Sequence, residues 1–164
     1  MRLLIFIVLV VCSGTSLAFG DREFNKDYDP QRSAVSDYRL ALKEANETNR
    51  LVLVVIGGDW CRWCHVLDRY IKSREALRAK LLQTFVVLKV NVSAENKNEK
   101  FLSKLPPIKG FPHFIIIGRT NSVLGFQNTA ALEKFGTTYS EKQFEIFIEY
   151  WKDINLHAKK IDNK

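Results

Sequence analysis

The chain has 164 residues, of which 46% are hydrophobic, and this length and composition predict one globular domain with a real core. Its formal net charge is +7, but the basic residues are spread along the sequence and do not form one run. No zinc-finger pattern or aromatic-glycine strand signature accompanies them. We therefore expect a solvated cationic surface and no nucleic-acid partner.

The first twenty residues have the composition of a secretory signal peptide. Arg2 precedes an unbroken apolar run over residues 3–11, and small residues then lead to Ala18 and Gly20. This order predicts a signal peptide over residues 1–20, cut near Ala18 or Gly20, and export to a periplasm, with secretion as the alternative. The apolar run is shorter than the roughly 20 residues that a spanning helix needs, so we expect no stable membrane insertion after cleavage. A retained membrane anchor stays open as a second interpretation.

The rest of the chain is read from its apolar periodicity and its turn residues. Residues 21–33 are polar and charged and are expected to form an N-terminal extension. A domain is expected over residues 34–158, followed by a tail over residues 159–164. The predicted elements, in chain order, are a helix over 34–47, a strand over 51–56, a helix over 59–82, a strand over 85–92, a short helix over 95–104, a strand over 114–117, a strand over 123–126, and a helix over 141–156 with Ser140 as its cap.

This order of elements predicts an α/β fold. Alternating helices and strands followed by a hairpin give a mixed sheet of about four strands with helices on both faces. A fifth strand could join on the N-terminal side. The run over residues 51–56 is continuously apolar and bounded by Gly57 and Gly58, which favours a central strand buried on both faces.

The cysteines are the most informative residues. Cys12 falls in the proposed signal peptide, which leaves Cys61 and Cys64 as the only pair in the mature chain. A ring closed over three residues removes little entropy from the unfolded chain, so this pair is a poor staple and is expected to serve chemistry. It stands where a strand ends and a helix begins, and a helix N-terminus stabilises a thiolate. We expect Cys61, nearer the helix end, to attack, and Cys64 to be the buried resolving thiol.

At these residues the sequence resembles the thioredoxin family. The run Gly58-Asp59-Trp60-Cys61-Arg62-Trp63-Cys64 is similar to the family's active-site loop, Lys89-Val90-Asn91-Val92 to its next strand, and Gly110-Phe111-Pro112 to the loop with its cis-proline. The resemblance covers about residues 34–155. It implies a thioredoxin fold and a thiol–disulfide oxidoreductase that acts on exported protein substrates, without a cofactor and with a separate redox partner. Phe111 and Pro112 would form one wall of the substrate site.

The sequence also departs from the family pattern. Many thioredoxins carry an Asp six residues before the first Cys, which helps to deprotonate the resolving Cys, and here that position is Val55. Lys89, the usual neighbour of that Asp, is retained. As an imidazolium, His65 is a candidate to stabilise the Cys61 thiolate. The charge of Arg62 would add to this effect, and the bulky Trp63 would either restrict access or offer an apolar face to substrates.

Several alternatives remain open from the sequence. The run Cys61-Arg62-Trp63-Cys64-His65 also matches the attachment signature of c-type haem, with His113 or His157 as a further ligand, although a buried strand before the motif does not suit a small cytochrome. The same thiols with an imidazole suit zinc or copper, but no second CxxC stands at ligand spacing. A non-catalytic binding module is the third alternative. Reductase, oxidase and isomerase share one scaffold, and the resemblance leans slightly towards a reductase.

Overall fold

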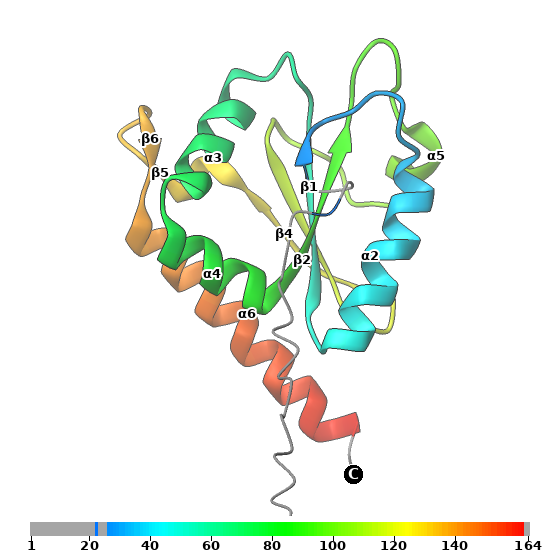
Figure 1. Cartoon of the computed structure of the whole chain (residues 1–164), viewed down its shortest axis with the longest axis vertical. Coiled ribbons are helices and arrows are strands. Elements are labelled where there is room, and N and C mark those ends of the chain that lie inside the picture. The colour runs from blue at the N-terminus through cyan, green and yellow to red at the C-terminus, as the bar shows by residue number, and fades with distance from the viewer. Residues whose placement is uncertain (1–21, 23–25, 163–164) are drawn as a thin grey trace, which may run out of the picture.

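The computed structural model describes residue 22 and residues 26–162 of the chain, with side chains as far as residue 158 (Figure 1). Its centre is a four-stranded mixed sheet in the order β2-β1-β3-β4. β1 (Leu51–Gly57) pairs in parallel with β2 (Phe85–Asn91) and antiparallel with β3 (His113–Ile117), which in turn pairs antiparallel with β4 (Val123–Asn128). The expected α/β thioredoxin fold with a mixed sheet of four strands is confirmed.

Helices cover both faces of this sheet. α2 (Ala34–Thr48) and the short α5 (Glu99–Leu102) lie on one face, and α3 (Arg62–Lys72), α4 (Glu75–Thr84) and α6 (Glu141–Asp162) on the other (Figure 1). Alternate residues of β1 point to opposite faces, so Val54 packs with Ala41 on the α2 side and Leu53 with Leu67 on the α3 side. All seven residues of β1 are buried, as its continuous apolar run predicts.

The helix predicted over residues 59–82 is two helices. α3 ends at Lys72 and α4 begins at Glu75, with Ser73 and Arg74 between them. The Ser73 hydroxyl and the Arg74 guanidinium both donate to the Tyr70 carbonyl, at 3.1 and 3.3 Å. These side chains satisfy a carbonyl at the end of α3, and the chain leaves the helix there. The start also differs, because Cys61 is the N-cap and the helix proper begins at Arg62.

The short helix predicted over residues 95–104 is reduced to α5, a single turn. Asn96 donates its side-chain amide to the carbonyls of Pro30 (2.8 Å) and Arg32 (3.1 Å), and Asn98 donates to the carbonyl of Asn91 (2.8 Å). These side-chain bonds to the backbone hold a loop in place of a helix.

Three further differences lie after β4. A 3-10 turn (Thr129–Leu132) and a small hairpin of β5 (Glu133–Lys134) and β6 (Thr138–Tyr139) were not predicted, and β6 packs against α3. α6 continues to Asp162, beyond the predicted end at residue 156.

The optional fifth strand on the N-terminal side is absent from the described residues, because no strand is present between residues 26 and 50.

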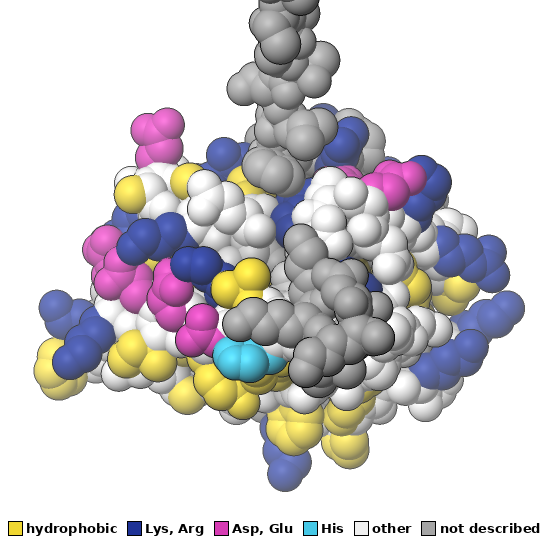
Figure 2. Space-filling view, turned by 90° about the horizontal axis from the view of Figure 1, so that it is seen from below, with side chains coloured by type: hydrophobic (Ala, Val, Ile, Leu, Met, Phe, Trp, Pro, Cys, Tyr) yellow, Lys and Arg dark blue, Asp and Glu magenta, His cyan; other side chains and the backbone are white. Residues whose placement is uncertain are grey.

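The signal peptide proposed over residues 1–20 lies outside the described residues. None of the helices within the described part has the length and apolar character to span a bilayer. On the face that Figure 2 shows, Lys and Arg side chains lie among acidic and hydrophobic ones. This mixing is consistent with the dispersed positive charge of the sequence.

Candidate active site

Cys61 and Cys64 form a disulfide at the N-terminus of α3, with their Cα atoms 5.2 Å apart. Cys61 has extended backbone angles and caps the helix with its own side chain, because its Sγ accepts a hydrogen bond from the Cys64 amide at 3.1 Å. Both residues are buried, Cys61 with 4% and Cys64 with 0% of its surface exposed. A sulfur in this place receives the backbone N–H groups and the positive end of the helix dipole, which favour a thiolate.

The turn from β1 into α3 depends on Gly57. A Cβ atom at this residue would lie only 2.5 Å from the Cys64 sulfur, so any larger side chain would displace the disulfide. The chain then turns through a bond from the Cys61 amide to the Gly58 carbonyl, 3.0 Å long. Strand β1 and this turn therefore place Cys61 at the N-terminus of α3.

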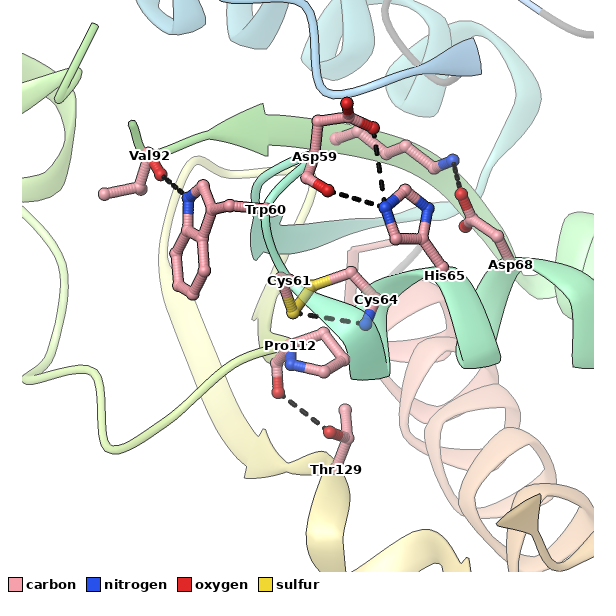
Figure 3. The surroundings of a disulfide bond; sticks show 10 residues. Asp59, Trp60, Cys61, Cys64, His65, Asp68, Val92, Pro112 and Thr129 are labelled. Carbon is pink, nitrogen blue, oxygen red and sulfur yellow. Dashed lines mark hydrogen bonds and ion pairs between the residues drawn. A yellow bond between two sulfur atoms is a disulfide. The ribbon is translucent and has the colours of Figure 1, made fainter. Parts of the chain in front are cut away.

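An aromatic and proline wall stands beside the disulfide. The Phe111–Pro112 peptide bond is cis, as the resemblance implies, and Pro112 lies directly against the two sulfurs in Figure 3. The Trp60 ring meets Phe111 edge-on with ring centroids 5.3 Å apart, and its indole N–H donates to the Val92 carbonyl at 2.6 Å. Trp60 remains 60% exposed. The structure thus brings together five predicted site residues, namely Trp60, Cys61, Cys64, Phe111 and Pro112.

Thr129 supports this wall from below and was missed by the sequence analysis. Its buried hydroxyl donates to the Pro112 carbonyl at 2.8 Å (Figure 3). Thr129 begins the unpredicted 3-10 turn, seventeen residues after Pro112, and no motif in the sequence links the two.

The three predicted helix residues around the cysteines point in different directions. The His65 imidazole faces Asp59 and donates to its carbonyl at 2.6 Å, with the Asp59 carboxylate 3.5 Å away (Figure 3). The hydrogen bond and ion pair of His65 are therefore made with Asp59 and not with the Cys61 sulfur. Arg62 is exposed. Trp63 is half-buried and meets Tyr139 edge-on, with centroids 5.6 Å apart, so its ring joins the core next to the β5–β6 hairpin.

The carboxylate that pairs with Lys89 lies on helix α3, whereas the family pattern places it on the strand that corresponds to β1. Val55 is buried in β1 and leaves that position without a charge, as the sequence shows. The Lys89 ammonium instead bonds Asp68 of α3 at 2.6 Å, with side chains 7% and 22% exposed. Asp68 was missed, although it stands four residues after Cys64 and seven after Cys61, on the same side of the helix.

The N-terminal extension also contributes to the site. Tyr28 is 6% exposed and belongs to the same core cluster as Cys61 and Cys64. The Lys89 ammonium lies 5.3 Å from the centre of its ring. From the sequence, residues 21–33 were expected to form a polar N-terminal extension, and Tyr28 was assigned no role.

The residues present do not fit a c-type haem or a metal. The two cysteine sulfurs are bonded to each other, and His65, which would have to ligate, is engaged with Asp59. Within the described part of the chain, no three His, Cys, Asp or Glu side chains gather in a cluster suited to a metal ion.

Comparisons with known proteins agree with this geometry. A family model described as thioredoxin-like matches residues 33–118, more than half of the chain. No curated protein matches in a sequence comparison.

Three solved structures illustrate the fold that this chain shares with known proteins. A disulphide isomerase from Xylella fastidiosa Temecula1 is 22% identical over 75% of this chain and 94% of its own, with a TM-score of 0.65. A DsbH oxidoreductase is 17% identical over 85% of this chain and 95% of its own, with a TM-score of 0.55. The C-terminal domain of Neisseria meningitidis DsbD in its oxidised form is 15% identical over 70% of this chain and 94% of its own, with a TM-score of 0.50. The chain belongs to the thioredoxin-like family, and its Cys61–Cys64 disulfide is that of a thioredoxin-fold thiol–disulfide oxidoreductase.

Proposed function

We propose that this protein exchanges disulfides with exported protein substrates, with Cys61 as the attacking thiol and Cys64 as the resolving thiol. The observation that carries the proposal is the placement of the disulfide, at the N-terminus of α3 and against cis-Pro112. Cys61 is the helix cap and the slightly more exposed of the two, whereas Cys64 has no exposed surface. The first therefore meets a substrate and the second acts within the protein.

The reaction passes two electrons from one dithiol to one disulfide. In the reducing direction, the Cys61 thiolate attacks a substrate disulfide and releases one substrate sulfur as a thiolate. The Cys64 thiolate then attacks the Cys61 sulfur, releases the second substrate sulfur, and leaves the Cys61–Cys64 disulfide. A separate redox partner must return two electrons to restore the dithiol.

The resolving step requires that Cys64 lose its proton inside the protein. We propose that the Asp68–Lys89 pair takes the place of the carboxylate that Val55 lacks. Asp68 lies one helical turn beyond Cys64, and its 22% exposed side chain connects the buried interior to solvent. The Asp68 carboxylate would therefore accept the Cys64 proton and pass it to water.

We propose reduction as the working direction, on the resemblance of the motif to thioredoxins. The solved structures of the same fold include a disulphide isomerase and an oxidoreductase, which supports disulfide exchange by this chain. Export, most simply to a periplasm, follows from the predicted signal peptide.

Insulin reduction by dithiothreitol tests the proposed function. The wild-type protein is expected to accelerate precipitation of the reduced insulin chain, and Cys61→Ser is expected to abolish the acceleration. A rate equal to the uncatalysed rate, together with a Cys61 that resists alkylation after reduction, would favour the non-catalytic binding module instead.

A further inference from the structure

The N-terminal segment lies across one end of the sheet, at the side of the disulfide. In Figure 1 this segment, drawn in blue, crosses the carboxyl ends of β1 and β2 before it enters α2. The Lys89 ammonium donates to the Lys26 carbonyl at 2.8 Å, and the Asn96 amide donates to the carbonyls of Pro30 and Arg32. Bonds on both sides of Tyr28 therefore fix the backbone that carries it.

These bonds place the Tyr28 ring against the resolving cysteine. The position of a Cβ on Gly57 would be 2.5 Å from the Cys64 sulfur and 3.0 Å from both Cε1 and Cζ of Tyr28. The sulfur and the hydroxyl-bearing edge of the ring thus share the space above Gly57. The ring is 6% exposed, so little solvent reaches this contact.

The hydroxyl of Tyr28 is buried and has no hydrogen-bond partner among the described residues while the disulfide is closed. Leaving a buried hydroxyl without a partner lowers the stability of the fold, so such groups are rare and call for an explanation. A disulfide sulfur is a weak acceptor, whereas a thiolate is charged and accepts strongly. Reduction of the disulfide would therefore place a strong acceptor beside the ring that carries this hydroxyl.

We propose that Tyr28 donates a hydrogen bond to the Cys64 sulfur in the reduced protein and is a positioning residue for the resolving thiolate. The inference rests on the proposed dithiol chemistry and deepens it. The Cys64 thiolate attacks the Cys61 sulfur of the mixed disulfide, the bond from Cys61 to the substrate breaks, and the substrate leaves as a thiolate. Tyr28 orients the Cys64 lone pair and keeps its own proton throughout.

The surroundings of Tyr28 agree with a donor that never ionises. Burial is the main cause that raises the pKa of Tyr28 well above its ordinary value, and the charge of Asp68 and the nearby Tyr139 phenol add to it. Lys89 faces the ring and is neutralised by Asp68. The phenol therefore stays protonated over the working pH range and cannot serve as the base.

Tyr28→Phe removes the hydroxyl and keeps the ring, and the reduction potential of the Cys61–Cys64 pair is the test. Loss of one hydrogen bond to the reduced form should shift the equilibrium constant with glutathione about three- to tenfold towards the disulfide. A tenfold shift corresponds to a potential about 30 mV more negative for this two-electron couple. Tyr70→Phe is the matched control, because its buried phenol also lacks a described partner but lies further along α3. It should leave the constant within about twofold.

The outcomes separate this inference from the proposed function. An unchanged potential in Tyr28→Phe would overturn the inference, because a hydroxyl that is unsatisfied in both redox states affects them equally. A wild-type disulfide that never equilibrates with glutathione would instead overturn the proposed function. As a second measurement, the pKa of the Cys64 thiol in Cys61→Ser should rise when Tyr28→Phe is added, and an unchanged pKa would also count against the inference.

Discussion

The sulfur of Cys61 caps the N-terminus of helix α3, and it is also the atom that reacts in the proposed function. Its sulfur receives the Cys64 amide at 3.1 Å, so a negative charge on it meets a backbone donor without any rearrangement. Cys64 has no exposed surface and gains its thiolate inside the core. The two sulfurs of one motif therefore have different environments, and this difference assigns their proposed roles.

The first prediction follows from that difference. Cys64→Ser removes the resolving thiol, so Cys61 should remain joined to the substrate as a mixed disulfide. Incubation with an oxidised protein substrate, followed by acid quenching and mass spectrometry, should show an adduct on Cys61. The matched variant Cys61→Ser should give little adduct, and preferential capture through Cys64 would show that the roles are reversed.

His113 follows Pro112 directly and is buried in β3 with 1% of its surface exposed. Its register neighbours are Ile56 and Asn128, its ring stacks on Phe126, and neither ring nitrogen has a partner among the described residues. Burial lowers the pKa of His113 below its usual value. The folded protein therefore resists protonation where the unfolded chain accepts it.

The sign of the resulting pH dependence is fixed. Well above its ordinary pKa of about 6.5 the imidazole is neutral in both states and the pKa difference has no effect on stability. As the pH falls towards the lowered pKa, only the unfolded chain gains the proton, so the free energy of unfolding decreases. His113→Leu should flatten this decrease between pH 7 and pH 5 in urea denaturation curves. His157→Leu, at an exposed position of α6, is the control, and an equal slope in both variants would contradict the assignment to His113.

Arg50 connects three elements at the end of the sheet remote from the disulfide. Its guanidinium donates to Glu44 of α2 at 2.6 Å, to the Leu82 carbonyl of α4 at 2.9 Å, and to the Phe85 carbonyl of β2 at 3.2 Å. It is 4% exposed, and burial lowers its pKa. The bonds therefore act in an environment of little solvent screening.

Arg50→Ala should lower the free energy of unfolding by about 2–4 kcal/mol, because the Leu82 and Phe85 carbonyls lose this donor and Glu44 keeps only its ion pair with Arg22. Arg39→Ala, on the exposed side of α2, should change it by less than about 0.5 kcal/mol. Chemical denaturation measures both. If both variants lose a similarly small amount of unfolding free energy, Arg50 does not hold these elements together.

The elements that the sequence predicts well are those whose burial follows a regular pattern along the element. β1 is apolar at every position because both its faces are covered, and α2 follows its helical period with only a one-residue difference at its end. The break between α3 and α4 was missed because it depends on the Ser73 hydroxyl bonding the Tyr70 carbonyl, which periodicity does not reveal. The β5–β6 hairpin was missed because each strand has only two residues.

Some residues of the candidate site could likewise be predicted from the sequence, and others could not. Cys61, Cys64 and Pro112 stand in a motif with known spacing, and the structure brings them together. Asp68 could have been found from its position one turn after Cys64, which places it on the cysteine side of α3. Tyr28 could not, because its contact with Gly57 joins residues far apart in the chain.

The residues of the proposed active site lie together at one end of the sheet. The turn after β1, the cis-proline loop before β3 and the N-terminal segment meet around the disulfide (Figures 1 and 3). The exposed Trp60 marks the open side of this end. A protein substrate would approach there, whereas the helices on both faces of the sheet bury the central strands β1 and β3.

Export is a prediction for the whole chain. Expressed in a bacterium from its full sequence, the protein should be recovered in the periplasmic fraction and begin shortly after Ala18 or Gly20, because small residues there follow the apolar run. Mass spectrometry of the recovered protein gives its first residue. An uncut chain in the membrane fraction would support a retained anchor instead.

The central claim is that Cys61 and Cys64 interconvert as one dithiol–disulfide couple, and its reduction potential is the most direct test. After equilibration in dithiothreitol or glutathione buffers, the alkylated and disulfide forms are counted by intact mass. The account predicts that both cysteines titrate together as a two-electron couple, with a potential of about −270 mV if the protein is a reductase of the thioredoxin type. A potential near −120 mV would contradict the reducing direction, and a disulfide that persists in every buffer, or two cysteines that titrate independently, would contradict the redox role itself.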